Sequence, residues 1–264
     1  MDRFVSIIIT HYAMNEERST LLRSSLTSLF QTIKENSAEV IVVDNGGSEK
    51  DSKYLLDLCA GGKINTYIRN NQNMHFGYAR NQALRVCNGD YIAVADNDIY
   101  YQYGWLDACL KVLEACPDKK IWATPIYNVA HWLPKYWVGE LEVDGLVYKL
   151  NARAGSNIWV MRRKDFEEVG EFLIHRVAGT KFVEEANAKD YSGAVTPKLM
   201  AEDLGFRRGY NVNDILPVKV VLSDGKEVFF NQDEFKRQNK RGNIFMEQKS
   251  FNPQARIRFK GDSS

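Results

Sequence analysis

The sequence predicts an α/β fold in which a mostly parallel central sheet is flanked by helices. Short runs of apolar and β-branched residues recur along the first hundred residues, and each run has the length of a buried strand. Segments with apolar residues at helical spacing separate these runs. Two of the runs end on an acid, which is expected where parallel strands present their carboxyl ends along one edge of a sheet.

Strands and helices are expected to alternate up to the end of the central strand. In chain order, the predicted elements are strand 4–10, helix 21–33, strand 39–44, helix 48–60, strand 64–68, helix 76–86 and strand 91–96. Ser48 can cap the second helix, because its hydroxyl can accept a hydrogen bond from a free backbone N–H. Alternation at this spacing predicts right-handed crossovers between parallel strands.

The second half of the chain has a weaker pattern. The elements expected there are helix 105–115, strand 121–125, strand 157–161, helix 163–169 with Gly170 as its C-cap, helix 202–208 and a last strand at 218–222. Residues 128–147 are expected to be irregular. Residues 173–199 show little periodicity and are expected to form a mobile or acceptor-facing segment.

The composition is that of an ordinary globular protein. The chain has 264 residues, of which 44% are hydrophobic and 26% charged, and its formal net charge is +1. This balance gives no global attraction to nucleic acid or to a membrane. Residues 231–260 nevertheless hold eight Lys and Arg against three acids, so the C-terminal stretch is basic.

The sequence shows neither a cysteine motif for a metal or redox site nor a recognisable targeting segment. The four cysteines form no C-x-x-C pair, and we interpret them as free thiols in a reducing compartment, without a zinc site. No secretory leader is recognisable, and no apolar run reaches the roughly 18 residues that span a bilayer. We expect a cytoplasmic protein, with peripheral attachment to the inner face of a membrane as an alternative.

Two acids one residue apart end the predicted central strand. Asp96 and Asp98 flank Asn97 on what must be a tight turn. Ligands of open α/β sheets collect just beyond the carboxyl ends of strands, and carboxylates are good ligands for a divalent cation that bridges to phosphate. The alternative is an ordinary polar turn, for which Asp and Asn are common residues.

Aromatic side chains gather in the irregular segment after the predicted strand 121–125. His131, Trp132, Tyr136 and Trp137 fall within seven residues. Such rings stack on sugars and on nucleobases, although they could equally seal a small subdomain. The sequence lacks both G-x-G-x-x-G and G-x-x-x-x-G-K-[ST], which argues against a dinucleotide domain or a P-loop.

Six segments, in this order, resemble the GT-A glycosyltransferases, specifically the family 2-like inverting enzymes that use nucleotide sugars. They are residues 5–10 with Tyr12, residues 25–29 with Gln31, residues 43–48, residues 73–81, the turn 96–98, and residues 155–156 followed by 162–163 and 169–172. The resemblance spans residues 4–215. It departs from the family at His75, where Gly is usual, and at 202–209, where the late Glu-Asp-x-Asp-Leu motif is shortened.

The resemblance implies a site for a nucleoside diphosphate sugar and for Mn²⁺ or Mg²⁺. The residues that it implies for the donor and the cation are Thr10, Tyr12 and Asp44 at the base, Arg80 at the base or the phosphates, Asp96 at the ribose and the cation, and Asp98 as the direct metal ligand. For Arg80 the alternative is a surface cation on a helix, and for Asp44 a solvated acid at a strand end. His131 and His175 are considered as third metal ligands and are not assigned.

The resemblance also implies a carboxylate that takes the proton of the acceptor hydroxyl. Asp203 is the candidate, and Glu202 is the fallback, because the shortened motif allows Asp203 to match either acid of the family pattern. Trp132, Trp137 and Ser156 are tentative acceptor-binding residues.

The function expected from this resemblance is metal-dependent, inverting transfer of a sugar from a UDP or dTDP donor to a hydroxyl of a surface glycan or glycolipid. Residues 1–222 would form the catalytic domain, with a nucleotide-sugar half at 1–104, an acceptor half at 105–222, and a basic extension at 223–264. Two alternatives remain: transfer to a modified nucleic-acid base held by residues 231–264, and a nucleotide-binding module without turnover.

Overall fold

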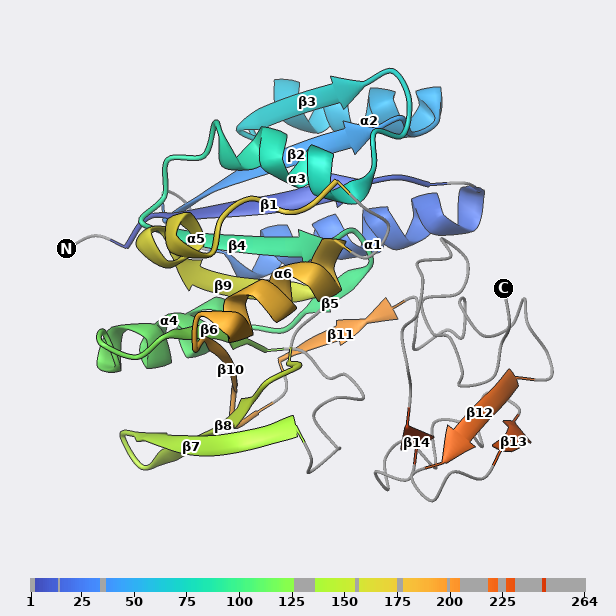
Figure 1. Ribbon diagram of the computed structural model, residues 1–264. Coiled ribbons are helices and arrows are strands. Elements are labelled where there is room, and N and C mark those ends of the chain that lie inside the picture. The colour runs from blue at the N-terminus through green and yellow to red at the C-terminus, as the bar shows by residue number, and fades with distance from the viewer. Residues whose placement is uncertain are drawn as a thin grey trace.

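The computed structural model describes residues 3–13, 15–33, 37–125, 136–154, 157–174, 178–198, 200–204, 218–222, 227–230 and 244–245 (Figure 1). Its elements in chain order are β1 (Val5–His11), α1 (Glu16–Thr32), β2 (Ala38–Asn45), α2 (Glu49–Ala60), β3 (Thr66–Asn70), α3 (Phe76–Leu84), β4 (Tyr91–Asp96), β5 (Ile99–Tyr101), α4 (Trp105–Ala115), β6 (Ile121–Thr124), β7 (Trp137–Val143), β8 (Leu146–Asn151), β9 (Ile158–Arg162), α5 (Arg163–Val169), α6 (Ala178–Ala188), β10 (Ser192–Val195), β11 (Ala201–Asp203), β12 (Val218–Leu222), β13 (Glu227–Phe230) and β14 (Ile244–Phe245).

A nine-stranded sheet in the order β3-β2-β1-β4-β9-β6-β10-β8-β7 forms the centre of the molecule. Strands β3, β2, β1 and β4 are parallel to one another, as the sequence predicts. Strand β9 then joins β4 in antiparallel orientation, and the outer hairpin of β7 and β8 is antiparallel as well. The carboxyl ends of β1, β2 and β4 therefore meet at one edge of the sheet, where the acidic turn follows β4.

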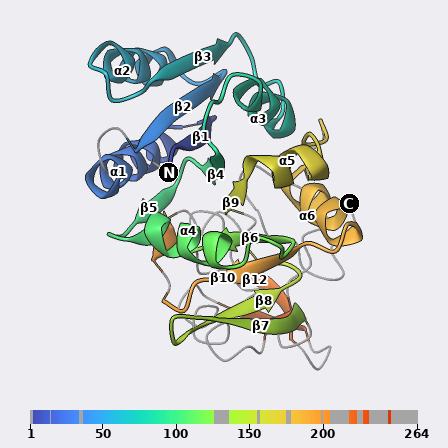
Figure 2. The same ribbon diagram turned by 90° about the vertical axis from the view of Figure 1, so that its left-hand side faces the viewer.

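Two apolar layers cover the two faces of this sheet. On β1, Ile7 and Ile9 pack in the cluster that includes residues of α1, α2 and α4, while Ile8 packs in the cluster of α3, α5 and α6. Figure 2 shows α1 and α2 on one side of the strands and α3, α5 and α6 on the other. Burial on both faces explains why the parallel strands are almost continuously apolar.

The first half of the chain agrees closely with the prediction, apart from the third strand. β3 begins at Thr66, two residues after the predicted start at Ile64. Ile64 is buried, but its backbone N–H bonds to the carbonyl of Leu58 at the end of α2. Its apolar side chain thus packs from a loop, which a pattern of hydrophobicity cannot distinguish from a strand.

The prediction of an irregular segment at 128–147 is wrong for the residues from Trp137 onward. They form the β7–β8 hairpin, whose turn places Asp144 at φ 50° and Gly145 at φ 73°. An Asp-Gly pair between alternating residues is the signal of a two-residue hairpin, because both positions need positive φ.

The predictions for 173–199 and 202–208 are also wrong where the structure describes those residues. Helix α6 packs Phe182 and Ala186 into the core, and β10 pairs with both β6 and β8. Glu202 and Asp203 belong to strand β11 rather than to a helix, because β11 pairs with β5, a strand that the sequence did not predict.

A separate sheet of three short strands lies near the C-terminus (Figure 1). The strand predicted at 218–222 is present as β12, but it is not the last, because it pairs with β13 and β14. The predicted division at residue 222 remains a prediction.

Arg162 at the end of β9 is a buried cation that joins three parts of the fold. Its guanidinium donates to the carboxylate of Asp165 at 2.6 Å and to the carbonyls of Leu113 at 2.7 Å and Cys116 at 3.1 Å. Arg162→Ala is expected to lower the free energy of unfolding by about 3 kcal/mol, because it leaves Asp165 buried without its cation. A urea titration measures this loss.

An exposed ion pair provides the control for this substitution. Arg85 lies 2.8 Å from Glu171, and both side chains are more than half exposed. Arg85→Ala is expected to change the free energy of unfolding by less than about 1 kcal/mol. Equal losses for the two variants would contradict the structural role of Arg162.

Candidate functional site

The acidic turn follows β4 at the carboxyl edge of the sheet. Thr10 of β1 pairs with Asp96 in the parallel register, so the end of β1 lies directly beside the turn. The side chain of Asp96 is 13% exposed, whereas Asn97 and Asp98 are buried. The turn leads at once into β5, which fixes the backbone on both sides of the two carboxylates.

Arg80 is a fully buried partner of Asp96. Its Nη2 lies 2.8 Å from Oδ1 of Asp96, and its guanidinium carbon lies 3.4 Å from the centre of the Phe76 ring and 4.9 Å from that of Trp159. The alternative of a surface cation is therefore wrong. Stacking between aromatic faces suits the planar guanidinium, and the ion pair holds the carboxylate of Asp96 in one place.

The helix that carries Arg80 begins at a strained residue. His75, which stands where the resembled family has Gly, adopts φ 67° and ψ 151°, a conformation that is close to being reserved for Gly. A residue with a Cβ is therefore strained at this position. His75→Gly is expected to raise the free energy of unfolding by about 1 kcal/mol, as measured by urea titration.

The matched variant for this prediction is His75→Ala. It removes the imidazole but keeps a Cβ in the same unfavourable conformation, so we expect no gain in stability from it. A gain of equal size in both variants would show that the imidazole, and not the backbone conformation, is the source of the strain.

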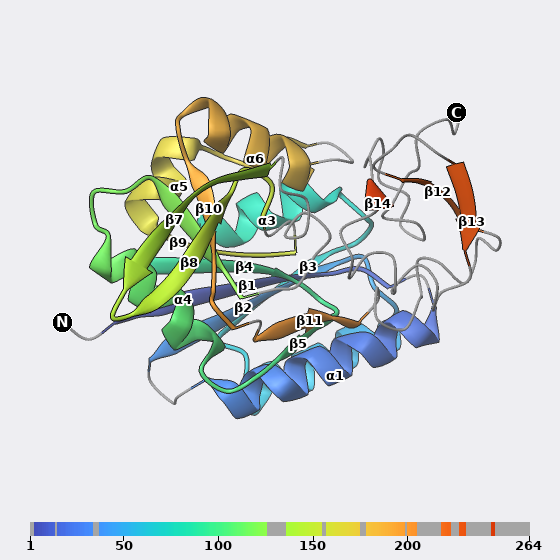
Figure 3. The same ribbon diagram turned by 90° about the horizontal axis from the view of Figure 1, so that it is seen from below.

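Asp203, the candidate base, is brought beside the acidic turn because its strand β11 pairs with β5. Asp203 pairs with Ile99, the first residue after the turn, and the N–H of Leu204 bonds to the carbonyl of Asp98 at 2.7 Å. Oδ2 of Asp203 accepts a hydrogen bond of 2.6 Å from Asn157, the residue before β9. Figure 3 shows β11 alongside β5. Residues 98 and 203, far apart in the sequence, are therefore neighbours.

Asp98 is held by a second buried arginine. Nη1 of Arg18, in the first turn of α1, lies 3.4 Å from Oδ2 of Asp98. Both carboxylates of the turn are thus accompanied by an arginine, which balances their charge in a buried position.

The three residues expected at the base take different positions. Thr10 is buried, and its Oγ1 has no hydrogen-bond partner among the described residues. Tyr12 is half-buried in the loop after β1. Asp44 is fully buried at the end of β2, so it is not a solvated acid, and its carboxylate accepts hydrogen bonds from Gly47, Ser52 and Tyr67. These donors come from the turn after β2, from α2 and from β3, so the carboxylate joins three parts of the fold.

Burial, followed by the hydrogen bond to Asp44, raises the pKa of Tyr67 from 10.0 to about 12. A pKa raised by folding contributes stability below pH 10 that is lost as the pH rises to about 12. Wild type is therefore expected to lose stability in this range more steeply than Tyr67→Phe. Urea titrations at several pH values check the difference, and identical slopes would contradict it.

Sequence reasoning missed His11, the last residue of β1. Its ring is fully buried, with Nδ1 2.8 Å from Nδ2 of Asn97 and Nε2 3.3 Å from Oδ2 of Asp51. A histidine in the last position of an otherwise apolar strand, beside the strand that ends on Asp96, was the available signal.

Among the described residues, the carboxylates of Asp96 and Asp98 on the turn after β4 are the candidate ligands for a cation. No group of three or more His, Cys, Asp or Glu side chains suited to hold a metal occurs in the parts of the chain that the structure describes. Two carboxylates fit the mode in which Mg²⁺ or Mn²⁺ takes one or two protein ligands and completes its shell with phosphates and water. Asp96 and Asp98 therefore suit a cation that arrives with a diphosphate.

The acceptor candidates are only partly described. Trp132 and Ser156 lie outside the described residues, as do His131 and His175. Trp137 begins β7, the outermost strand, and is 43% exposed, with Nζ of Lys149 lying 4.3 Å from the centre of its ring. In the sheet, β9, β6, β10 and β8 separate this strand from β4.

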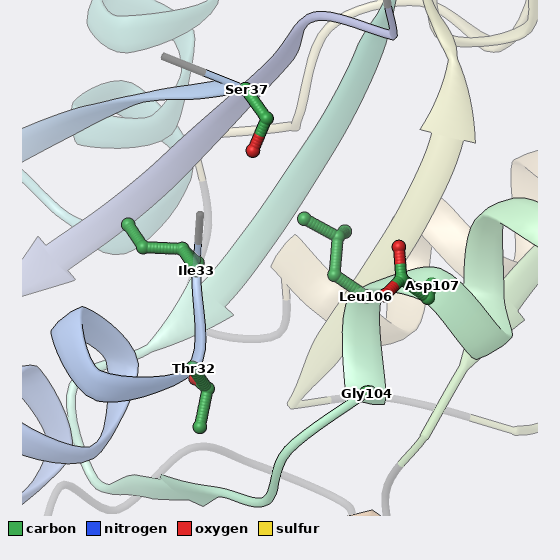
Figure 4. Close-up of a pocket in the computed structure, with 6 residues that line it drawn as sticks. All are labelled: Thr32, Ile33, Ser37, Gly104, Leu106 and Asp107. Carbon is green, nitrogen blue, oxygen red and sulfur yellow. The ribbon is translucent and has the colours of Figure 1, made fainter. Parts of the chain in front are cut away.

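A small hollow of about 30 Å³ lies between the end of α1, the start of β2 and the start of α4 (Figure 4). Its lining residues are Thr32, Ile33, Ser37, Gly104, Leu106 and Asp107. α1 leaves the carboxyl end of β1 and returns to the start of β2, so this hollow lies away from the acidic turn. It is also far smaller than the roughly 300 Å³ of a ligand pocket.

Of the helices that the structure describes, none is long and apolar enough to cross a membrane.

Residues 6–170 match the family described as Glycosyl transferase family 2. Putative polypeptide N-acetylgalactosaminyltransferase 13 of Drosophila melanogaster is 31% identical over 118 residues, which cover 41% of this chain and 21% of that protein. An uncharacterized glycosyltransferase of Methanocaldococcus jannaschii is 28% identical over 99 residues, 37% of this chain and 33% of that protein. The chain thus spans a third or less of these relatives' lengths.

Solved structures share the fold at low sequence identity. GalNAc-T7 with UDP, GalNAc and Mn²⁺ has a TM-score of 0.59 at 11% identity, covering 76% of this chain and 44% of that chain. The mannosyltransferase PcManGT from Pyrobaculum calidifontis, in complex with GDP-Man and Mn²⁺, has a TM-score of 0.57 at 16% identity, with coverages of 78% and 58%. S. aureus TarS has a TM-score of 0.58 at 17% identity, with coverages of 75% and 36%.

Proposed function

The chain belongs to glycosyltransferase family 2, and from this membership we propose that it transfers a sugar from a nucleoside diphosphate donor to an acceptor hydroxyl with inversion. The donor would carry UDP or dTDP, and the acceptor would be a glycan or glycolipid. UDP and Mn²⁺ occur with GalNAc-T7, which shares the fold, and this supports a donor and a divalent cation of that kind here.

One observation supports the proposal: β11, which carries Asp203, pairs with β5 directly after the turn that carries Asp96 and Asp98. The turn with Asp96 and Asp98 would hold the donor's diphosphate and its cation, and Asp203 reaches the same place on β11. Buried Oγ1 of Thr10, which has no partner among the described residues, lies on the strand beside Asp96 and could bond to the incoming nucleotide.

The proposed reaction is a single displacement. The acceptor oxygen attacks the anomeric carbon while Asp203 takes its proton, and the bond from that carbon to the diphosphate oxygen breaks. The electron pair of the broken bond leaves with the nucleoside diphosphate, so the configuration at the anomeric carbon inverts. A divalent cation held by Asp98 and Asp96 would offset the charge that develops on the diphosphate. Arg80, whose Nη2 lies 2.8 Å from Oδ1 of Asp96, would hold this carboxylate in place for the task.

A panel of nucleotide sugars tests the proposal. We expect UDP or dTDP sugars to raise the melting temperature only when Mn²⁺ or Mg²⁺ is present, because a ligand selective for the folded state stabilises it. Release of nucleoside diphosphate from the best ligand would then show turnover. Binding without any release, with or without added acceptors, would favour a nucleotide-binding module instead.

The nucleic-acid alternative requires its own measurement. Most of residues 231–264 lie outside the described residues, so the structure adds nothing in its favour. DNA binding that weakens with salt and disappears on removal of residues 231–264 would support it.

A further inference from the structure

His11 connects the acidic turn to a different part of the fold. Asn97, on the Nδ1 side of its ring, stands between the two acids of the turn. Asp51, on the Nε2 side, lies in the first turn of α2. The buried imidazole therefore joins the end of β1 to both the turn after β4 and the helix after β2.

The carboxylate of Asp51, which bonds to His11, is itself held by several other side chains. Its carboxylate accepts hydrogen bonds from Ser19 at 2.6 Å and from Ser48 at 3.0 Å, and Nη2 of Arg23 lies 3.3 Å away. Burial acts to raise the pKa of Asp51, but hydrogen bonds from His11 and Ser19 outweigh it and hold the pKa well below its ordinary value. Asp51 is therefore ionised and can only accept hydrogen bonds.

Because Asp51 can only accept, the direction of the hydrogen bonds that link Asp51, His11 and Asn97 is fixed. Nε2 of His11 must carry the proton, because it faces a carboxylate that cannot donate. Nδ1 faces Nδ2 of Asn97, an amide nitrogen that can only donate, so Nδ1 accepts an N–H of the Asn97 side chain. Asp51 thus fixes the tautomer of His11, and His11 fixes the orientation of the Asn97 amide.

The ring is packed closely on the side of Gly47. A Cβ added to Gly47 would lie 3.1 Å from Cδ2 and Nε2 of His11 and 2.8 Å from Oδ1 of Asp44. The glycine turn after β2 therefore lies directly against the imidazole, which is fully buried. Because the imidazole is contacted on its edge and bonded at both nitrogens, its fixed position also fixes the side chain of Asn97.

We propose that His11 is a positioning residue for the acidic turn. By holding Asn97, it fixes where Asp96 and Asp98 present their carboxylates to a nucleoside diphosphate and its divalent cation. The identity of the ligand rests on the proposed function, whereas the ordering of the turn by His11 does not. Partners that hydrogen-bond a ligating side chain are worth about 10–100-fold in affinity or activity, and because His11 acts one residue away from the two carboxylates, we expect an effect at the lower end of this range.

The test uses His11→Gln, Asn97→Ala and the double variant in the full chain. Gln cannot bridge both partners, and Asn97→Ala removes the turn's side of the contact while the pair of His11 and Asp51 stays intact. Calorimetry with UDP and Mn²⁺ is expected to show a dissociation constant raised about tenfold in each single variant. The double variant should be no weaker than the singles, because both changes remove the same contact.

Hydrogen exchange of the apo protein gives a readout that does not need a ligand. Peptides that cover residues 95–101 should exchange faster in both single variants. Ser6→Ala is the matched control, because Ser6 is buried at the amino end of the same strand, where its Oγ accepts the N–H of Gly89 at 2.7 Å. It should lower the melting temperature without changing either UDP affinity or exchange at 95–101.

The outcomes separate this inference from the proposed function. If wild type fails to bind UDP with Mn²⁺, the proposed function is overturned, and hydrogen exchange alone decides the role of His11. If His11→Gln and Asn97→Ala behave as Ser6→Ala does, the positioning role is overturned. Should His11→Gln not fold, Asn97→Ala decides the question by the same two measurements.

Discussion

Asp203→Asn is expected to lower kcat by about 10²–10⁴-fold while the affinity for the donor changes little, because the variant loses the proposed base for the acceptor's proton. The substitution is close to isosteric, and Asn keeps an oxygen that can accept the 2.6 Å hydrogen bond from Asn157. The fold should therefore survive. Initial rates of transfer and a titration with donor measure the two effects separately.

Glu202→Gln is the control on the same strand. Glu202 pairs with Tyr100 of β5, and neighbouring residues of a strand point to opposite faces of its sheet. We expect Glu202→Gln to keep kcat within a few-fold of wild type. The reverse result would assign the base to Glu202, and small effects in both variants would show that neither acid takes the proton.

Asp98→Asn is expected to lower kcat/KM by about 10³-fold, which corresponds to about 4 kcal/mol of transition-state stabilisation. The substitution removes one of the two carboxylates of the turn and leaves Arg18 beside a neutral amide. The concentration of Mn²⁺ that gives half-maximal rate should rise at the same time. Rates measured over a range of Mn²⁺ concentrations test both expectations.

Asp165→Asn distinguishes loss of a metal ligand from loss of a buried charge. Asp165 is also buried and paired with an arginine, at 2.6 Å from Arg162, but it lies on α5. We expect this variant to melt at a lower temperature and to keep its dependence on Mn²⁺. An unchanged Mn²⁺ requirement in Asp98→Asn would contradict the assignment of Asp98.

The sheet edge and the acidic turn could be predicted from the sequence because local signals define them. The buried strands of the first half are continuous apolar runs, and Ser48 caps α2 as expected, with its side chain accepting the N–H of Asp51. Strand 91–96 has the predicted bounds, so the turn at Asp96 and Asp98 was placed correctly. Patterns of this kind depend on a few neighbouring residues and survive folding unchanged.

The remaining parts of the site depend on contacts between distant residues. β11 has three residues, and it is a strand only because β5, a hundred residues earlier, pairs with it. Phe76 precedes Arg80 by one helical turn, but Trp159 and Asp96, which complete the surroundings of its guanidinium, lie on strands β9 and β4. The turn of the β7–β8 hairpin is different, because Asp144 and Gly145 carried a local signal that the prediction did not use.

The short ladder of β5 and β11 has a kinetic consequence. A ribbon of three residue pairs is marginally stable by itself, so whatever immobilises one strand also immobilises the other. A donor docked against Asp98 would stiffen β11 and complete the place where the second substrate attacks. Under the proposed function, this coupling would favour an ordered addition of substrates, in which the donor enters first and the nucleoside diphosphate leaves last.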